Sequence, residues 1–149
     1  MIYSAGILLW RYREPGLKEY LVVSPGGPLW TARYSWAPPK GQMEEGETPW
    51  EAAYREFSEE TSIPLEGNEE DYTYEGLLKQ RKDKSVHIFS RQYIPDVDLS
   101  LCHSNLFTWT DGYEYPEIGH YAWMTTSEIG DYGVKVYTEL MKRIDERDY

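Results

Sequence analysis

The chain has 149 residues, of which 40% are hydrophobic and 28% are charged, and its net charge is −11 at pH 7. A length of this order is typical of one domain with a buried core, so we expect a single domain over residues 1–149. The acidic balance argues against duplex nucleic acid and anionic membranes as partners, because both need clustered lysine and arginine. No apolar run approaches the roughly 18–20 residues that a membrane-spanning helix requires.

Two further features bear on the compartment. The first residues, MIYSAG, lack the basic region and the cleavage site of a secretory signal peptide. The single cysteine, Cys102, cannot form an internal disulfide and is interpreted as a small buried apolar side chain. We therefore expect a cytoplasmic protein, either a monomer or a homodimer.

Runs of aliphatic and aromatic residues predict the strands. They lie at residues 2–10, 19–24, 72–80, 85–93 and 119–124. The charged turn 81–84 joins two of them. The chain around 38–41 is expected to be irregular, and residues 95–116 are expected to form a long loop.

Two helices are predicted. The first begins after Thr48 and runs to about residue 61, because Thr48 and Glu51 form a Thr-x-x-Glu capping box and Pro49 suits the first helical position. The second covers about residues 133–148. Its apolar positions share one face, and they are Tyr137, Leu140, Met141 and Ile144. Strands and helices mixed in this order predict an α/β sandwich with a mixed sheet.

The first helix carries an unusual set of acids. A helix turns about 100° per residue, so Glu56, Glu59 and Glu60 lie on one face, within about 60° of one another. Like charges at this spacing repel each other. A divalent cation bound by carboxylate oxygens would compensate for the repulsion. The alternative is a solvated acidic face that binds no metal.

The rest of this helix suggests how the acids are held. The core-facing stripe is predicted from helical spacing and consists of Trp50, Ala53, Tyr54 and Phe57. Arg55 stands beside the acidic face. Either Glu51 or Glu47 could pair with Arg55 and fix it in place.

The spacing of the whole segment adds a family resemblance. Gly41, five residues, Glu47, seven residues and then REFSEETSI at 55–63 resemble the Nudix box, G-x5-E-x7-R-E-U-x-E-E-x-G-U with U apolar. One position departs, because Ser62 stands where the family usually has glycine. A left-handed residue is often needed after a helix, and serine adopts it at a cost of about 1 kcal/mol. We therefore expect Ser62→Gly to leave activity intact and to raise stability slightly.

The resemblance implies a Nudix-type α/β/α sandwich around a mixed sheet, and an enzyme that hydrolyses a phosphoanhydride bond in a nucleoside-diphosphate-linked substrate. It implies Mg²⁺, with Mn²⁺ as the alternative, as the cofactor. The implied metal ligands are Glu56, Glu59, Glu60 and the Gly41 carbonyl. Such ions neutralise phosphate oxygens and lower the pKa of bound water.

The resemblance also assigns roles to residues beside the metal. Glu47 would orient Arg55 in the catalytic site. The base that removes the proton from the attacking water is either Glu56 or Glu59, or else Glu117. The simpler interpretation of Glu117 is a loop acid before an edge strand.

Two segments point to a substrate class. WAPPKG at 36–41 is similar to the W-x-x-P-K-G segment of dinucleoside polyphosphate hydrolases and of related small bacterial Nudix proteins. Glu117, Tyr121 and Trp123 fit the E-x3-Y-x-W spacing of diadenosine tetraphosphate hydrolases. A tyrosine that often marks these enzymes beyond the box is absent, since residues 79–81 are Lys-Gln-Arg.

The expected substrate is therefore nucleotide-like, with diadenosine tetraphosphate as the leading candidate. Another Nudix substrate (a nucleoside triphosphate, ADP-ribose, a nucleotide sugar or a capped RNA end) and a non-catalytic binding module are the alternatives. Lys40 and Arg81 are the candidate phosphate contacts, and Trp36 is a candidate for stacking on a base. Lys82 and Lys84 are interpreted mainly as a solvated hairpin turn.

Overall fold

A computed structural model describes residues 1–27 and 35–147. Its strands are β1 Ile2–Glu14, β2 Leu17–Pro25, β3 Lys40–Gln42, β4 Thr73–Arg81, β5 Lys84–Gln92, β6 Leu106–Thr108, β7 Glu114–Pro116 and β8 Ile118–Met124. Its α-helices are α1 Pro49–Thr61, α2 Thr126–Ile129 and α3 Lys135–Asp145. Short 3₁₀ turns lie at Glu69–Asp71, Leu99–Leu101 and Gly130–Tyr132.

The main sheet has six strands and mixed directions. Five of them follow the order β4-β5-β1-β2-β8, and β3 pairs with β1 beside this path. The β1–β5 pair is parallel, and the other pairs are antiparallel. Along one edge of β1, residues 4–6 pair with β3 and residues 10–14 pair with β2. This division brings β3, which begins the acidic segment, against the first half of the central strand.

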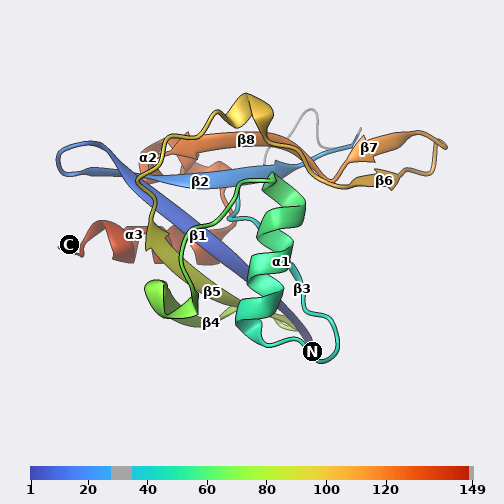
Figure 1. The fold of residues 1–149 in the computed structure, drawn as a ribbon, viewed down its shortest axis with the longest axis horizontal. Helices are drawn as coiled ribbons and strands as arrows, with labels where there is room; N and C mark the ends of the chain where they lie inside the picture. The colour runs from blue at the N-terminus through green and yellow to red at the C-terminus, as the bar shows by residue number, and fades with distance from the viewer. Residues whose placement is uncertain (28–34, 148–149) are drawn as a thin grey trace.

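Two helices cover the two faces of the sheet (Figure 1). Residues 4–10 of β1 are all buried, as expected for a central strand covered on both sides. Ala5, Ile7 and Leu9 pack in the core beneath α1, whereas Leu8 and Trp10 pack in the core beneath α3. The predicted α/β/α sandwich around a mixed sheet is therefore confirmed.

The first helix begins where the sequence predicts. Both halves of the capping box between Thr48 and Glu51 form, and Pro49 is the first helical residue. Ala53 and Phe57 are buried, but Tyr54 is 43% exposed, so its predicted core position is wrong. Ala52 is buried instead, because α1 is rotated so that its buried stripe continues through Phe57 to Glu60.

The second predicted helix also forms, with different ends. All four of its predicted core residues are buried. It begins at Lys135 rather than near residue 133, because a 3₁₀ turn at Gly130–Tyr132 precedes it, and it ends at Asp145. The predicted end at 148 lies outside the described residues.

Two segments predicted to be irregular contain strands. β3 begins at Lys40, and residues 95–116 include the hairpin β6–β7, in which Phe107 is opposite Tyr115. The hairpin extends away from the body of the fold (Figure 1). These strands are only three residues long, which is too short for an alternating pattern to stand out. No helix in residues 1–27 and 35–147 is long and apolar enough to cross a bilayer.

Candidate active site

The acids of α1 lie against β3. Glu60 is only 6% exposed, and its carboxylate accepts the main-chain N–H of Lys40 at 3.2 Å. The Glu56 carboxylate lies against Gly41, where an added Cβ would stand 2.1 Å from the Glu56 Cδ. Glycine at position 41 therefore makes room for this carboxylate. Glu59, one turn along the same face, has a side chain that is 36% exposed.

Arg55 ties the acidic face to the loop before the helix. Its Nε and Nη2 donate to the two oxygens of Glu47 at 2.7 and 2.9 Å, which is a two-bond fork. Its Nη1 donates to Glu56 at 2.9 Å and to Glu59 at 3.1 Å. Of the two predicted partners, Glu47 is the one that pairs with Arg55, because Glu51 is used in the capping box.

The charges around this face perturb one another. Burial, together with repulsion from Glu56 and Glu117, raises the pKa of Glu60 to about 8. Burial also raises the pKa of Glu56, in spite of its bond to Arg55. Acids with raised pKa values in one cluster are typical of functional sites. Their mutual repulsion is relieved when a cation or a proton binds.

The donor set fits a hard cation. Carboxylate oxygens and a main-chain carbonyl are the ligands that Mg²⁺ prefers, and the ion is commonly held by one or two carboxylates and completed by water and substrate phosphates. In residues 1–27 and 35–147, no three side chains of His, Cys, Asp or Glu are grouped so that they could hold a metal ion by themselves. An ion at this face would therefore need ligands from water and from a phosphate-bearing substrate.

Glu117 reaches the same cluster from a distant part of the chain. It is exposed, and its charge contributes to the raised pKa values of both Glu56 and Glu60. Its N–H donates to the Asn105 carbonyl at 2.8 Å, and its carbonyl accepts the N–H of Gly26 at 2.8 Å. Glu117 therefore faces the helix acids from a main chain that is bound on both sides.

The three candidate substrate contacts, Lys40, Arg81 and Trp36, lie in different surroundings. Lys40 lies beside the acids, since Glu60 attracts its ammonium, and burial with repulsion from Lys84 lowers its pKa to about 8. Arg81 lies at the exposed end of β4 and binds Asp83 at 2.9 Å. Trp36 packs against the α3 side of the core, and its ring centroid is 6.5 Å from that of His120.

Sequence reasoning did not assign the roles of three contributors to this region. Lys84, interpreted mainly as a turn residue, is close enough to Lys40 to lower its pKa. Tyr121 donates its hydroxyl to the Glu60 carbonyl at 2.5 Å. Asn105 links Glu59 to Glu117 through its main chain. The E-x3-Y-x-W spacing was the available signal for Tyr121, whereas Asn105 acts through its backbone, which leaves no trace in the side-chain pattern.

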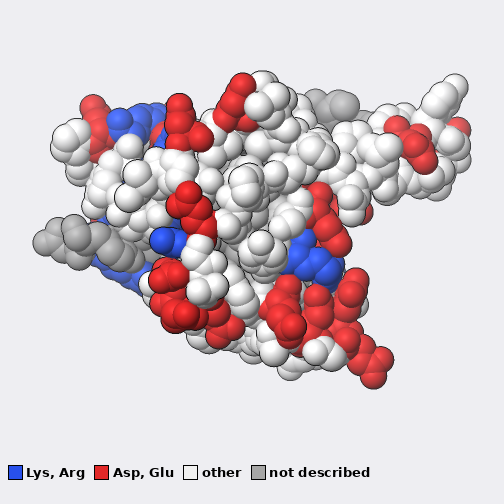
Figure 2. Space-filling model, viewed as in Figure 1, with Lys and Arg blue, Asp and Glu red and all other residues white. Residues whose placement is uncertain are grey.

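The surface reflects this arrangement. Figure 2 shows acidic side chains gathered beside α1 and β3, around a basic patch. Elsewhere on this face, acidic side chains gather in a second group at the lower left, and others lie at the top and on the right-hand arm with no basic side chain beside them. The net negative charge of the chain is thus concentrated partly at the candidate site.

Comparison with known proteins gives consistent results. The family model described as NUDIX domain matches residues 5–143. The chain is 30% identical over 129 residues to the bis(5'-nucleosyl)-tetraphosphatase [asymmetrical] of Caenorhabditis elegans, which covers 83% of this chain and 89% of the relative.

Solved structures show the same fold. A C. elegans Ap4A hydrolase binary complex matches with a TM-score of 0.57 and 23% identity, covering 97% of this chain and 95% of that one. The NUDIX domain of Shewanella oneidensis NrtR, complexed with ADP ribose, matches with a TM-score of 0.67 and 12% identity, covering 99% and 88%.

Proposed function

The chain belongs to the Nudix family and is a pyrophosphohydrolase, and we propose that its substrate is a dinucleoside polyphosphate such as diadenosine tetraphosphate. The observation that carries the proposal is the cluster of Glu56, Glu60 and Glu117 around the β3 backbone, with Lys40 beside it. The similarity to the C. elegans tetraphosphatase supports the choice of substrate.

We propose that a divalent cation, Mg²⁺ or alternatively Mn²⁺, is held by Glu56, Glu59, Glu60 and the Gly41 carbonyl. When bound, it would neutralise phosphate oxygens and make the attacking water more acidic. Arg55 would hold Glu56 and Glu59 in place through its bonds to both. The fork with Glu47 fixes the guanidinium, so Arg55 can hold both acids from one fixed position.

Glu117 is the proposed general base. Glu56 and Glu59 each give an oxygen to Arg55, and their other oxygens are the ones proposed to bind the cation. Glu117 is exposed and faces the same cluster, so it can accept the proton of a water that attacks phosphorus. Glu56 or Glu59 is the alternative base.

The substrate proposal follows from the distribution of positive charge. Lys40 and Lys84 are neighbours next to the acids, and Arg81 is opposite Lys84 in the β4–β5 register. A long polyphosphate could contact the cation, Lys40 and Arg81 at once. Trp36 is the proposed contact for a base. Binding energy from these remote contacts would serve to align the scissile bond.

The test is a comparison of kcat/KM for diadenosine tetraphosphate, ADP-ribose and a nucleoside triphosphate with Mg²⁺, with products separated by chromatography. We expect diadenosine tetraphosphate to be preferred by tenfold or more, which corresponds to about 1.4 kcal/mol. Excess chelator should abolish turnover of every substrate. A tenfold preference for either competitor would contradict the substrate assignment, and absence of turnover on the whole panel would favour a binding module.

A further inference from the structure

Ser62 has a strained backbone at the end of α1. Its φ is 61°, and in residues 1–27 and 35–147 it is the only residue other than glycine with a positive φ. The left-handed conformation costs serine about 1 kcal/mol relative to glycine. Strain of this kind persists only where surrounding contacts enforce it, and it gathers at functional sites.

The side chain of Ser62 makes such contacts with His103. Its Oγ donates to the His103 carbonyl at 3.0 Å and lies 3.0 Å from Nε2 of the same residue. A hydroxyl has one hydrogen, so Nε2 must be the donor in the second bond. Ser62 therefore holds both the main chain and the ring of His103.

Asn105, two residues after His103, is hydrogen-bonded to Glu117. The N–H of Asn105 donates to the Glu59 carbonyl at 3.3 Å, and the Asn105 carbonyl accepts the N–H of Glu117 at 2.8 Å. Ser104 reinforces this connection, because its Oγ accepts the N–H of Ile118 at 2.9 Å. The main chain of Asn105 thus connects α1, at Glu59, to Glu117.

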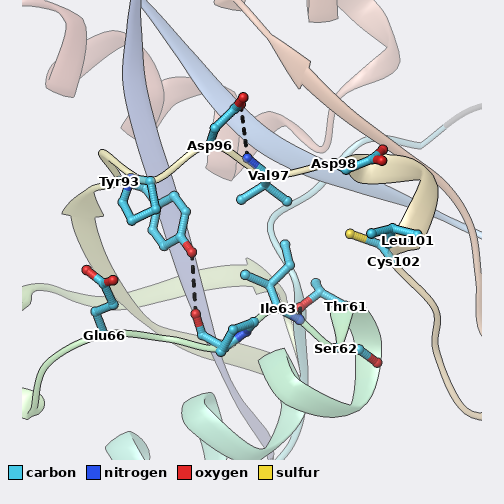
Figure 3. Close-up of a pocket in the computed structure, with 12 residues that line it drawn as sticks. Thr61, Ser62, Ile63, Glu66, Tyr93, Asp96, Val97, Asp98, Leu101 and Cys102 are labelled. Carbon is cyan, nitrogen blue, oxygen red and sulfur yellow. Dashed lines mark hydrogen bonds between the residues drawn. The ribbon is translucent and has the colours of Figure 1, made fainter.

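The segment before His103 borders a pocket. A pocket of about 440 Å³ lies between the end of α1 and residues 93–102 (Figure 3). Val97 and Cys102 line it, and the Ser62 hydroxyl turns away from it. The two bonds to Ser62 attach His103 to the end of α1 just ahead of Asn105, while Val97 and Cys102 earlier in the segment pack against the core beneath the helix.

We propose that Ser62 is a positioning residue, which anchors His103 so that Asn105 holds Glu117 at a fixed separation from Glu56 and Glu60. The proposal rests on the proposed role of Glu117 as the base. It explains why a strained serine occupies a position that the Nudix box gives to glycine. It differs from the expectation that Ser62→Gly is harmless, because glycine would relieve the backbone but release His103.

The first test compares Ser62→Gly with Ser58→Ala, using diadenosine tetraphosphate or whichever nucleotide the wild type turns over fastest. Ser58 is the matched control, because its Oγ bonds only within the helix, to the Tyr54 carbonyl. We expect Ser62→Gly to remain folded and to lower kcat about tenfold with little change in KM, as a small misplacement of a reacting group does. Ser58→Ala should change neither constant.

Combination with Glu117→Gln decides whether Ser62 acts through Glu117. In the Glu117→Gln background, Ser62→Gly should cause no further loss of kcat. An equal loss in both backgrounds, or a wild-type kcat for Ser62→Gly alone, would overturn the proposal. A wild-type kcat for Glu117→Gln would remove the assigned base and with it this role of Ser62, whereas a different preferred nucleotide would contradict only the substrate.

Amide hydrogen exchange tests the anchor without any substrate. Exchange at the amides of Asn105 and Glu117 should become about tenfold faster in Ser62→Gly and in His103→Ala, because local opening no longer has to break the Ser62 bonds. Ser58→Ala should exchange at the wild-type rate. Unchanged protection of both amides in Ser62→Gly would overturn the proposal, whatever the kinetic result.

Discussion

Two buried glutamates on opposite sides of the fold respond differently to their surroundings. The side chain of Glu75, on β4, is 3% exposed, and Arg147 binds both of its oxygens at 2.7 Å. Glu60, on α1, is 6% exposed, and its carboxylate receives the main-chain N–H of Lys40. Burial acts to raise both pKa values, but bonds from Arg147 and Ser90 bring that of Glu75 below its usual range, whereas that of Glu60 reaches about 8.

The difference lies in the neighbours rather than in the burial. A guanidinium neutralises Glu75, which therefore behaves as part of a structural ion pair that joins β4 to the end of the chain. Glu60 lies beside Glu56 and Glu117, and in the described residues no arginine or lysine forms an ion pair with it within 4 Å. A buried acid among like charges is costly to the fold, and such groups cluster at functional sites.

The largest expected contrast is between Glu60→Gln and Glu75→Gln. Glu60→Gln should lower kcat by about 100-fold or more, since it removes a proposed metal ligand, and should leave the protein folded. Glu75→Gln should keep kcat but lower the free energy of unfolding by on the order of 2 kcal/mol, because it removes the carboxylate that receives two charged bonds from Arg147. Steady-state kinetics of both variants measure kcat, and chemical denaturation measures their free energies of unfolding. Near-normal turnover of Glu60→Gln with Mg²⁺ would refute the metal assignment.

A second contrast uses two glycines. In Gly41→Ala the new methyl group would overlap the Glu56 carboxylate, so we expect kcat to fall at least tenfold, the scale on which small displacements of reacting groups act. Gly16→Ala, in the β1–β2 turn, has nothing within 4 Å of the new atom but a φ of +80°. It should cost about 1 kcal/mol of stability and leave kcat unchanged. Equal kinetic losses in the two variants would mean that Glu56 does not depend on room at Gly41.

A third contrast is a pH dependence of stability in the absence of metal. Because the pKa of Glu60 is about 8 when folded, against an ordinary value of 4.5, its contribution to stability is fully present below pH 4.5. It falls as the pH rises from about 4.5 and is lost as the pH passes 8. Relative to Glu60→Gln, the wild type should lose at most about 1.4 kcal/mol per pH unit in this window.

Denaturation of both proteins across this range, in chelator, measures the difference. Added Mg²⁺ should reduce the trend in the wild type, because a bound cation favours the ionised carboxylate. Parallel stability curves for the wild type and Glu60→Gln would show that Glu60 ionises as readily in the folded state as in the unfolded one. Glu75→Gln serves as the control, since it leaves the Glu60 environment intact.

Much of the acidic face could be predicted because its members lie on one helix. The angular positions of Glu56, Glu59 and Glu60 follow from 3.6 residues per turn, and the capping box fixes where that helix begins. The sequence left the partner of Arg55 open between Glu47 and Glu51. The fold resolves it, because the same Glu51 carboxylate accepts the Thr48 N–H.

The remaining parts of the site depend on contacts between distant segments. The rotation of α1 that exposes Tyr54 and buries Glu60 is set by packing on the sheet, which helical periodicity alone does not specify. The approach of Lys84 to Lys40 follows from the pairing of β1 with both β3 and β5.

The sequence by itself therefore determined the family, the layered α/β architecture and the acids of α1, because these depend on local spacing along one element. Only the tertiary structure decided how Glu117 meets those acids and what holds it there. Its place depends on main-chain hydrogen bonds through Asn105 and on the Ser62 contact with His103. Such bonds use groups that every residue carries, or a single exposed hydroxyl, so no pattern of residue types encodes them in advance.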